Sequence, residues 1–179
     1  MPRSLLAFLI GFCAVLTAGW TALPKLLYTR QAQPVAFWHK THAAKSGTAD
    51  CASCHVLRDD GAFAGLPANE GCAGCHAEPM GTTPAEATLV NNYIKPQRET
   101  PWLVYARQPA NVRFSHAIHA RRAGLECSKC HGAHGDTDVV PVYLQNRISG
   151  YSRDLLSMGA CEKCHREHHV DAGCLGCHQ

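Results

Sequence analysis

Beyond its first 23 positions the sequence has few Leu, Ile, Val and Phe residues, the side chains from which most protein cores are built. The 46% hydrophobic fraction of the 179-residue chain is raised by an apolar N-terminal run and by 11 Cys, while 15 Gly and 10 Pro favour loops. Side chains alone are therefore not expected to build a large aliphatic core, and another group must hold the part after residue 30 together.

Two further absences narrow the function. The sequence has no block of Lys or Arg and a formal net charge of only +3, so it has no basic segment of the kind that binds nucleic acid. It also lacks the CxxCxxC runs that are typical of iron–sulfur proteins. The 11 Cys and 12 His exclude a disordered tail, because both residue types are far above their usual frequency.

Ten of the eleven Cys form five CxxC pairs, and each pair is followed directly by His. CxxCH is the attachment signature of c-type haem, in which the two thiols add to the vinyl groups and the His supplies the proximal imidazole. We number the motifs 1 to 5 in chain order: Cys51-Ala-Ser-Cys54-His55, Cys72-Ala-Gly-Cys75-His76, Cys127-Ser-Lys-Cys130-His131, Cys161-Glu-Lys-Cys164-His165 and Cys174-Leu-Gly-Cys177-His178. They predict five covalently bound haem c groups.

Two other uses of CxxC explain the pattern less well. A disulfide framework accounts for an even number of Cys, but it leaves the five His unexplained, and a bridge within CxxC would constrain very little chain. Structural zinc needs four ligands, so the pairs would have to combine two by two, which leaves one of the five over.

The chain begins with an apolar run of twenty uncharged residues, Ser4 to Leu23. As a helix this run is about 30 Å long, the thickness of a bilayer core. A cleaved secretory signal is the alternative, but no convincing small-residue cleavage site precedes a polar start. We therefore expect residues 1–30 to hold a cytoplasmic start and an uncleaved anchor over about 4–23. The anchor crosses the inner (cytoplasmic) membrane once, and residues 31–179 lie in the periplasm or an equivalent extracytoplasmic space, where haem is attached to CxxCH.

An aromatic-x-His-x-x-His unit occurs twice, as Phe37-Trp-His39-Lys-Thr-His42 before motif 1 and as Phe114-Ser-His116-Ala-Ile-His119 before motif 3. The repeat divides the outer part into a two-haem half (31–80) and a three-haem half (110–179). The connector between them (81–109) contains no Cys or His, and we expect a short helix in it near residues 86–93. The predicted fold class is one N-terminal transmembrane helix followed by a small, mostly irregular and short-helical multihaem cytochrome c domain with the haems as its core.

Each of the five irons needs a sixth ligand, and seven His remain outside the motifs. The H-x-x-H spacing places two imidazoles on one helical face, so each unit can serve the first haem of its half and a neighbouring haem. We expect these four distal ligands to be His39, His42, His116 and His119. The fifth position stays open among four residues: Met158, whose thioether would raise the potential, and His168, His169 and His134.

Several segments carry a resemblance to known families. They are Pro101 to His119, the Gly-Leu-Glu that leads into motif 3, and the run Met158-Gly-Ala-Cys161-Glu-Lys-Cys164-His165-Arg. The sequence resembles the pentahaem cytochrome c subunit of alternative complex III and, more distantly, the multihaem subunit of the related menaquinone reductase complex. Its Phe-x-His-x-x-His units are similar to those of class III cytochromes c. The first family matches the five motifs in number, whereas the second carries six.

The resemblance implies a subunit that carries electrons and has no catalytic residue of its own. Quinol is then oxidised elsewhere in a respiratory or photosynthetic complex, beside an iron–sulfur or molybdopterin-like subunit and polytopic quinol-binding membrane subunits. Electrons would leave through the haems to a soluble cytochrome, a copper protein or an oxidase. One alternative remains, a small single-anchor multihaem quinol dehydrogenase that acts on quinol directly, with Asp50, Asp59 or Asp60 as a proton acceptor.

Overall fold

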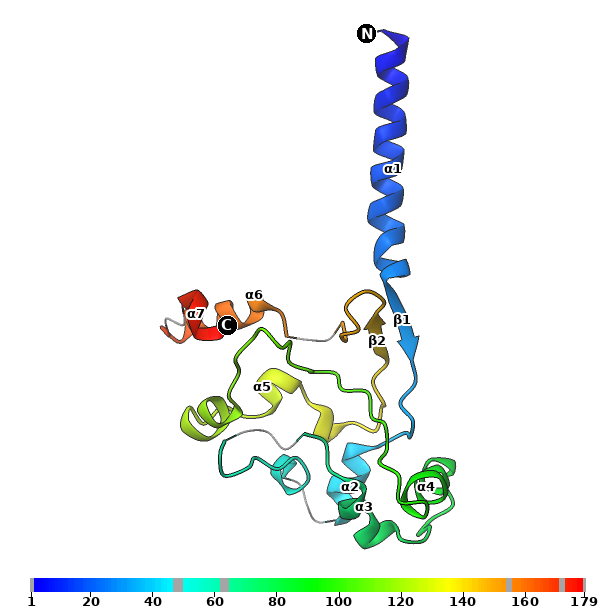
Figure 1. The fold of residues 1–179 in the computed structure, drawn as a ribbon, viewed down its shortest axis with the longest axis vertical. Coiled ribbons are helices and arrows are strands. Elements are labelled where there is room, and N and C mark those ends of the chain that lie inside the picture. The colour runs from blue at the N-terminus through cyan, green and yellow to red at the C-terminus, as the bar shows by residue number, and fades with distance from the viewer. Residues whose placement is uncertain (1, 47–49, 62–64, 154–155, 171–172, 179) are drawn as a thin grey trace.

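A computed structural model describes residues 2–46, 50–61, 65–153, 156–170 and 173–178. Its most prominent element is the N-terminal helix α1 (Arg3–Leu27), which stands apart from the rest of the chain as a long rod (Figure 1). The helix is long and apolar enough to cross a bilayer, and none of its residues is buried within the protein. The hydroxyls of Thr17 and Thr21 donate to carbonyls inside the helix, which satisfies them without water. The helix runs past the expected end at residue 23, through Pro24 and Lys25.

A two-stranded antiparallel sheet lies at the base of α1. Strand β1 (Tyr28–Gln31) follows the helix directly and pairs with β2 (Tyr143–Asn146), with Tyr28 opposite Asn146 and Gln31 opposite Tyr143. The backbone N–H of Arg147 also donates to the carbonyl of Leu27, at 2.8 Å. The sequence did not predict this sheet, which joins two segments far apart in the sequence and fixes the outer part to α1.

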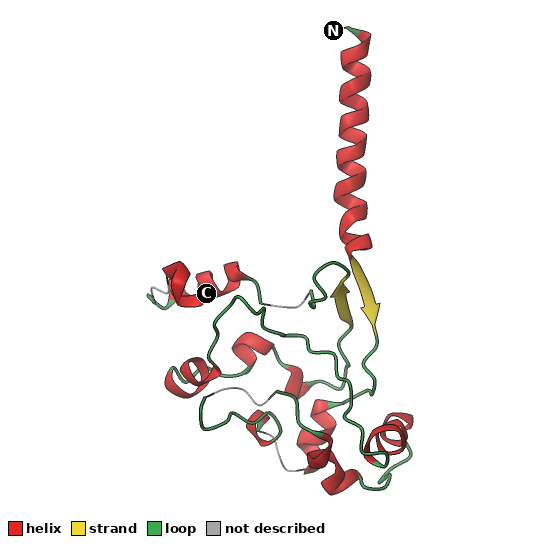
Figure 2. Ribbon diagram, in the orientation of Figure 1, coloured by secondary structure: helices red, strands yellow, loops and turns green. Residues whose placement is uncertain are grey.

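The remaining elements are short helical segments joined by loops (Figure 2). The α-helices are α2 (His39–Ser46), α3 (Asn69–His76), α4 (Pro84–Leu89), α5 (Ser128–His131), α6 (Met158–Glu167) and α7 (Gly173–Cys177). The 3-10 turns are η1 (Cys51–Ser53) and η4 (His134–Asp136), and the π-helical turns are η2 (Val90–Ile94) and η3 (Ala117–Arg122). The expected helix in the connector is confirmed by α4 and η2. The expected fold class, an apolar N-terminal helix before a small short-helical and irregular part, is confirmed as well.

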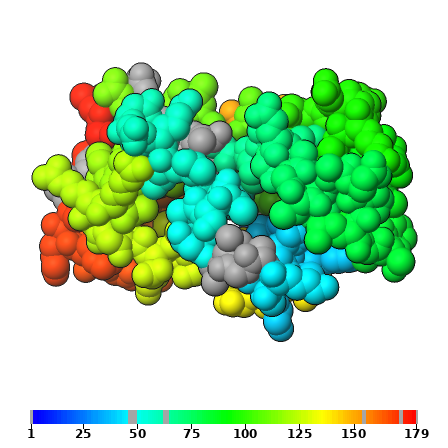
Figure 3. Space-filling model, turned by 90° about the horizontal axis from the view of Figure 1, so that it is seen from below, coloured from blue at the N-terminus to red at the C-terminus, as the bar shows by residue number. Residues whose placement is uncertain are grey.

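Side chains form only a small core in the described part of the chain. The buried hydrophobic residues are Val35, Leu89, Val90 and Tyr143. The accessible surface is 13323 Å², whereas a compact monomer of this mass exposes about 8,500 Å². The isolated helix contributes part of the excess. Open packing of the domain contributes another part of the excess surface. Seen from below in Figure 3, the domain consists of segments with openings between them.

The two halves of the outer part are in direct contact. The segment that contains η4 packs on α2, where Asp138 accepts hydrogen bonds from the backbone and the hydroxyl of Thr41, both at 2.9 Å. Gln33 exchanges two hydrogen bonds with the backbone of Leu103 in the connector. In Figure 1, α6 and α7 lie at the level of the base of α1, and α3 and α4 lie at the end farthest from it.

Candidate haem-binding site

All five CxxCH motifs lie on helical turns: motif 1 on η1, motif 2 on α3, motif 3 on α5, motif 4 on α6 and motif 5 on α7. A helical turn brings residues i and i+3 to one face, so the two thiols of a motif point the same way. All eleven cysteines lie in the described part of the chain and are free thiols, exposed or half-buried. Among the described residues, no three His, Cys, Asp or Glu side chains converge on one point, as a zinc site would require.

Four motif histidines each face one histidine of an H-x-x-H unit. The ring centres are 6.4 Å apart in His39–His55, 6.1 Å in His42–His76, 6.2 Å in His116–His131 and 6.1 Å in His119–His165. Three of the pairs are nearly parallel, with interplanar angles of 20°, 7° and 16°, whereas the His42–His76 pair is tilted by 54°. Each H-x-x-H unit therefore faces the histidines of two successive motifs.

This spacing fits a metal ion between the two rings. Two metal–nitrogen bonds of about 2 Å, with half an imidazole beyond each, place the ring centres about 6 Å apart. Direct stacking of the rings would bring them much closer. The paired imidazoles, the accessible thiols and the open surface of the domain thus fit haem groups held between the elements.

The aromatic residue of each repeat fixes the orientation of both imidazoles. Phe37 stacks on His42 with ring centres 4.1 Å apart and meets His39 edge-on. Phe114 stacks on His119 at 4.6 Å and meets His116 edge-on in the same way. The sequence repeat is therefore also a structural repeat.

Backbone carbonyls set the tautomer of the second imidazole in each repeat. Nδ1 of His42 lies 2.9 Å from the carbonyl oxygen of Trp38, and Nδ1 of His119 lies 2.8 Å from that of Ser115. A carbonyl oxygen only accepts, so Nδ1 carries the proton and Nε2 has the lone pair that a metal needs. Burial and neighbouring imidazoles also lower the pKa of His39, His116 and His131, which favours the neutral, ligating form at neutral pH.

Neighbouring thiols reveal which motifs adjoin. Burial raises the pKa of four motif cysteines, and for each of them the thiol with the largest further effect belongs to another motif. The neighbouring thiols are Cys72 with Cys54 (motifs 2 and 1), Cys51 with Cys127 (motifs 1 and 3), Cys130 with Cys164 (motifs 3 and 4) and Cys161 with Cys177 (motifs 4 and 5). The motifs therefore lie in the order 2–1–3–4–5, which differs from their order in the sequence.

The connector holds motif 2 at both ends of α3. At the start of the helix, the buried Asn69 donates to the carbonyl of Arg98 at 2.7 Å and accepts from the hydroxyl of Thr100 at 2.9 Å. At its end, Nδ1 of His76 lies 2.9 Å from Oε1 of Glu86. Neither Asn69 nor Glu86 was expected from the sequence to contact a haem-binding motif. A Thr-x-x-Glu capping signature at 83–86 marks the start of α4 but does not indicate a role beside a haem ligand.

The four candidates for the fifth distal position lie in different places. His134 adds to the electrostatic effects that lower the pKa of His39 and His131, after burial, and so lies near motifs 1 and 3. His168 is the C-cap of α6, and His169 adopts a left-handed conformation (φ 56°) just beyond it. Met158 begins α6 and is 62% exposed.

The last motif is fixed by backbone contacts. Val112 forms a β-bridge with His178, and the N–H of Arg113 donates to the carbonyl of Cys177 at 2.7 Å. These contacts join motif 5 to the segment before the second H-x-x-H unit.

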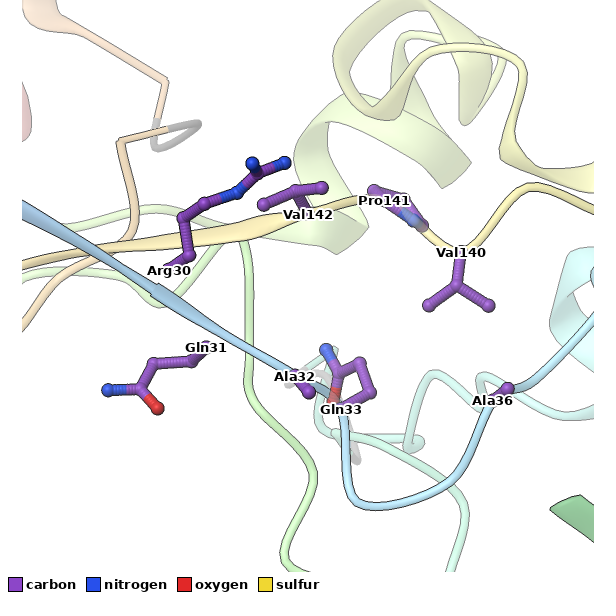
Figure 4. A pocket seen from close by; sticks show the side chains of 8 residues that line it. All are labelled: Arg30, Gln31, Ala32, Gln33, Ala36, Val140, Pro141 and Val142. Atoms are coloured by element: carbon purple, nitrogen blue, oxygen red, sulfur yellow. The ribbon is translucent and has the colours of Figure 1, made fainter.

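An open cavity of about 480 Å³ lies between β1 and the segment that precedes β2 (Figure 4). It is lined by Arg30, Gln31, Ala32, Gln33, Ala36, Val140, Pro141 and Val142. None of these residues is a histidine or a cysteine, so the cavity is separate from the imidazole pairs.

One curated relative matches almost the whole chain. It is the menaquinone reductase, multihaem cytochrome c subunit, of Nitratidesulfovibrio vulgaris. The two sequences are 39% identical over 187 positions, which cover 96% of this chain and 89% of the relative. No protein-family model matches the chain.

Proposed function

Because the chain belongs to the family of the multihaem cytochrome c subunit of menaquinone reductase, we propose that it is the electron-relay subunit of a quinone-linked membrane complex. In this proposal it binds five haem c groups through the ten motif cysteines, with His55, His76, His131, His165 and His178 as proximal ligands. The observation that carries the proposal is the set of four imidazole pairs with ring centres 6.1 to 6.4 Å apart. Closed bis-imidazole sites suit electron transfer, because they leave no position for a substrate.

Bound haem would supply one-electron redox chemistry, and the chain fixes where that chemistry takes place. The H-x-x-H units tie motifs 1 and 2 together and motifs 3 and 4 together, and the neighbouring thiols of Cys51 and Cys127 join the two groups. The result is a row from motif 2 at the end far from α1 to motifs 4 and 5 at the level of its base (Figure 1). Such a row connects a site near the membrane with a site far from it.

The relative's name describes reduction of menaquinone. We therefore assign the net direction from a soluble carrier to the membrane, the reverse of the quinol oxidation that the resemblance to alternative complex III implied. The other assignments follow the sequence analysis: α1 is a single-pass anchor in the inner membrane, and the outer part is periplasmic. The partners are an iron–sulfur or molybdopterin-like subunit, polytopic quinone-binding subunits, and a soluble cytochrome or copper protein.

The haem content tests this function directly. Mass spectrometry of the purified chain is expected to give the mass of the polypeptide with five haems, and electron paramagnetic resonance (EPR) is expected to show low-spin iron only. The isolated chain should not react with menaquinol, because in this proposal the quinone site belongs to other subunits. A high-spin signal that shifts with quinone analogues would instead support the single-anchor quinol dehydrogenase.

We propose Met158 as the distal ligand of the fifth haem, and its replacement by Ala is expected to lower the potential of that haem. A thioether ligand raises the potential relative to imidazole, so its loss removes the highest-potential component of a redox titration. The charge-transfer band of thioether-ligated ferric haem should disappear from the optical spectrum at the same time. His168→Ala, His169→Ala and His134→Ala serve as controls. If one of these histidine variants loses a low-spin signal while the spectrum and potentials of Met158→Ala stay those of the unmodified protein, the fifth distal ligand is that histidine.

A further inference from the structure

Glu86 forms the carboxylate contact of the proximal histidine at motif 2. Its Oε1 lies 2.9 Å from Nδ1 of His76, and the two side chains retain only 12% and 21% of their exposure. The carboxylate also accepts from the backbone N–H groups of Met80 at 2.7 Å and of Gly81 at 2.9 Å. Three N–H donors therefore converge on one carboxylate group. For comparison, the Nδ1 atoms of the distal His42 and His119 lie against neutral backbone carbonyls.

The local fold is built to direct this carboxylate at His76. Thr83 caps α4 by accepting from the N–H of Glu86, as in a capping box. In a complete capping box the Glu side chain would return to the backbone N–H of the capping residue. Here it instead turns to the loop after motif 2. The loop has a glycine where the carboxylate approaches, and a Cβ at position 81 would lie 3.0 Å from Oε2 of Glu86.

A carboxylate on Nδ1–H makes the opposite nitrogen of the imidazole a stronger electron donor. Stronger donation favours ferric over ferrous iron, and so lowers the reduction potential. We propose that Glu86 is a positioning residue that acts through His76 to lower the potential of the haem at motif 2. The proposal rests on the proposed function, because it requires haem at this motif. Motif 2 is the end of the row farthest from α1, so a low potential there favours electron movement toward the membrane end (Figure 1).

The test is the potential of this haem in a Glu86→Gln variant of the full-length holoprotein. Because the rings of His42 and His76 are tilted by 54°, an iron held between them should give a low-spin EPR signal distinct from those of the nearly parallel pairs. A Cys72→Ala, Cys75→Ala variant assigns that signal by its loss. We expect Glu86→Gln to shift the reduction equilibrium of this haem at least tenfold toward the ferrous form, which for one electron is about 59 mV. The other haems should keep their potentials.

Glu78→Gln is the matched control. Glu78 lies in the same loop and pairs with Lys95 at 2.7 Å, but its side chain is 73% exposed. The control removes the same charge near motif 2 and leaves the contact with His76 in place. An equal shift in both variants, or no shift in Glu86→Gln, would overturn the proposal.

Two further variants distinguish an effect on the haem potential from an effect on folding. Thr83→Ala removes the cap of α4 but keeps the carboxylate, so it should lower the melting temperature and shift the potential less than Glu86→Gln does. If Glu86→Gln does not incorporate haem, Glu86→Asp is titrated instead. The shorter side chain withdraws the carboxylate from His76, so the potential should rise, and an unchanged potential would refute the proposal. If haem is absent from motif 2 of the unmodified protein, the EPR signal is missing from the start, and this failure belongs to the proposed function.

Discussion

Replacing Cys127 and Cys130 by Ala is expected to reduce electron transfer through the subunit by several orders of magnitude, to the background rate. In the thiol neighbours of the described residues, motif 3 lies between motif 1 and motif 4. The thiol of Cys127 adjoins that of Cys51 in motif 1, and the thiol of Cys130 adjoins that of Cys164 in motif 4. Without motif 3 the row 2–1–3–4–5 separates into two pairs. Electron tunnelling falls exponentially with distance, so a gap one haem wide stops the current.

The measurement is menaquinone reduction by membrane vesicles that carry the intact complex, with a soluble reduced cytochrome as donor. The same substitutions in motif 2, Cys72→Ala and Cys75→Ala, are the control, because they shorten the row at one end and leave four motifs in contact. The control should keep more activity than the motif 3 variant. Mass spectrometry must find four haems in each protein. A motif 3 variant with four haems and the original rate would contradict the order of the row.

The imidazole pairs could be predicted from the sequence because they depend on local spacing. Residues three apart lie on one helical face, so His116 and His119 had to point toward the same side of their turn. The same rule places the two thiols of each CxxC together. The spacing also predicted that one imidazole of each unit serves the first haem of its half and the other a neighbouring haem, without saying which imidazole faces which motif. In the structure both imidazoles lie opposite motif histidines, and their ligation of haem iron stays a prediction.

The features that the sequence did not predict depend on contacts between distant segments. The pairing of Tyr28–Gln31 with Tyr143–Asn146 joins segments far apart in the sequence, and each strand is too short to show an alternation of apolar and polar residues. The position of motif 1 between motifs 2 and 3 follows from contacts between the two halves, such as that of Asp138 with Thr41. Glu86 carried a helix-start signal, but its contact with His76 depends on the path of the loop between them.

Removal of all haem is expected to unfold residues 31–179 and leave α1 intact. The variant carries Ala at the ten motif cysteines and is measured by far-UV circular dichroism and limited proteolysis. The physical reason is the small core. In the described part of the chain only four hydrophobic side chains are buried, and each contributes about 1.5–3 kcal/mol at most. The four are too few to offset the conformational entropy of so long a chain.

The buried hydrophobic residues are unevenly distributed along the chain, and this distribution predicts where the haem-free variant unfolds first. Leu89 and Val90 lie in the connector beside α3, and Val35 and Tyr143 lie near the sheet at the base of α1. No buried hydrophobic residue lies in α5, α6 or α7, so motifs 3, 4 and 5 depend most on bound haem. Proteolysis should therefore begin in residues 110–179. A single-motif control, Cys174→Ala with Cys177→Ala, should stay folded, because four haems remain to order the chain. A haem-free variant with a cooperative thermal transition and the original dichroism spectrum would show that side chains alone suffice.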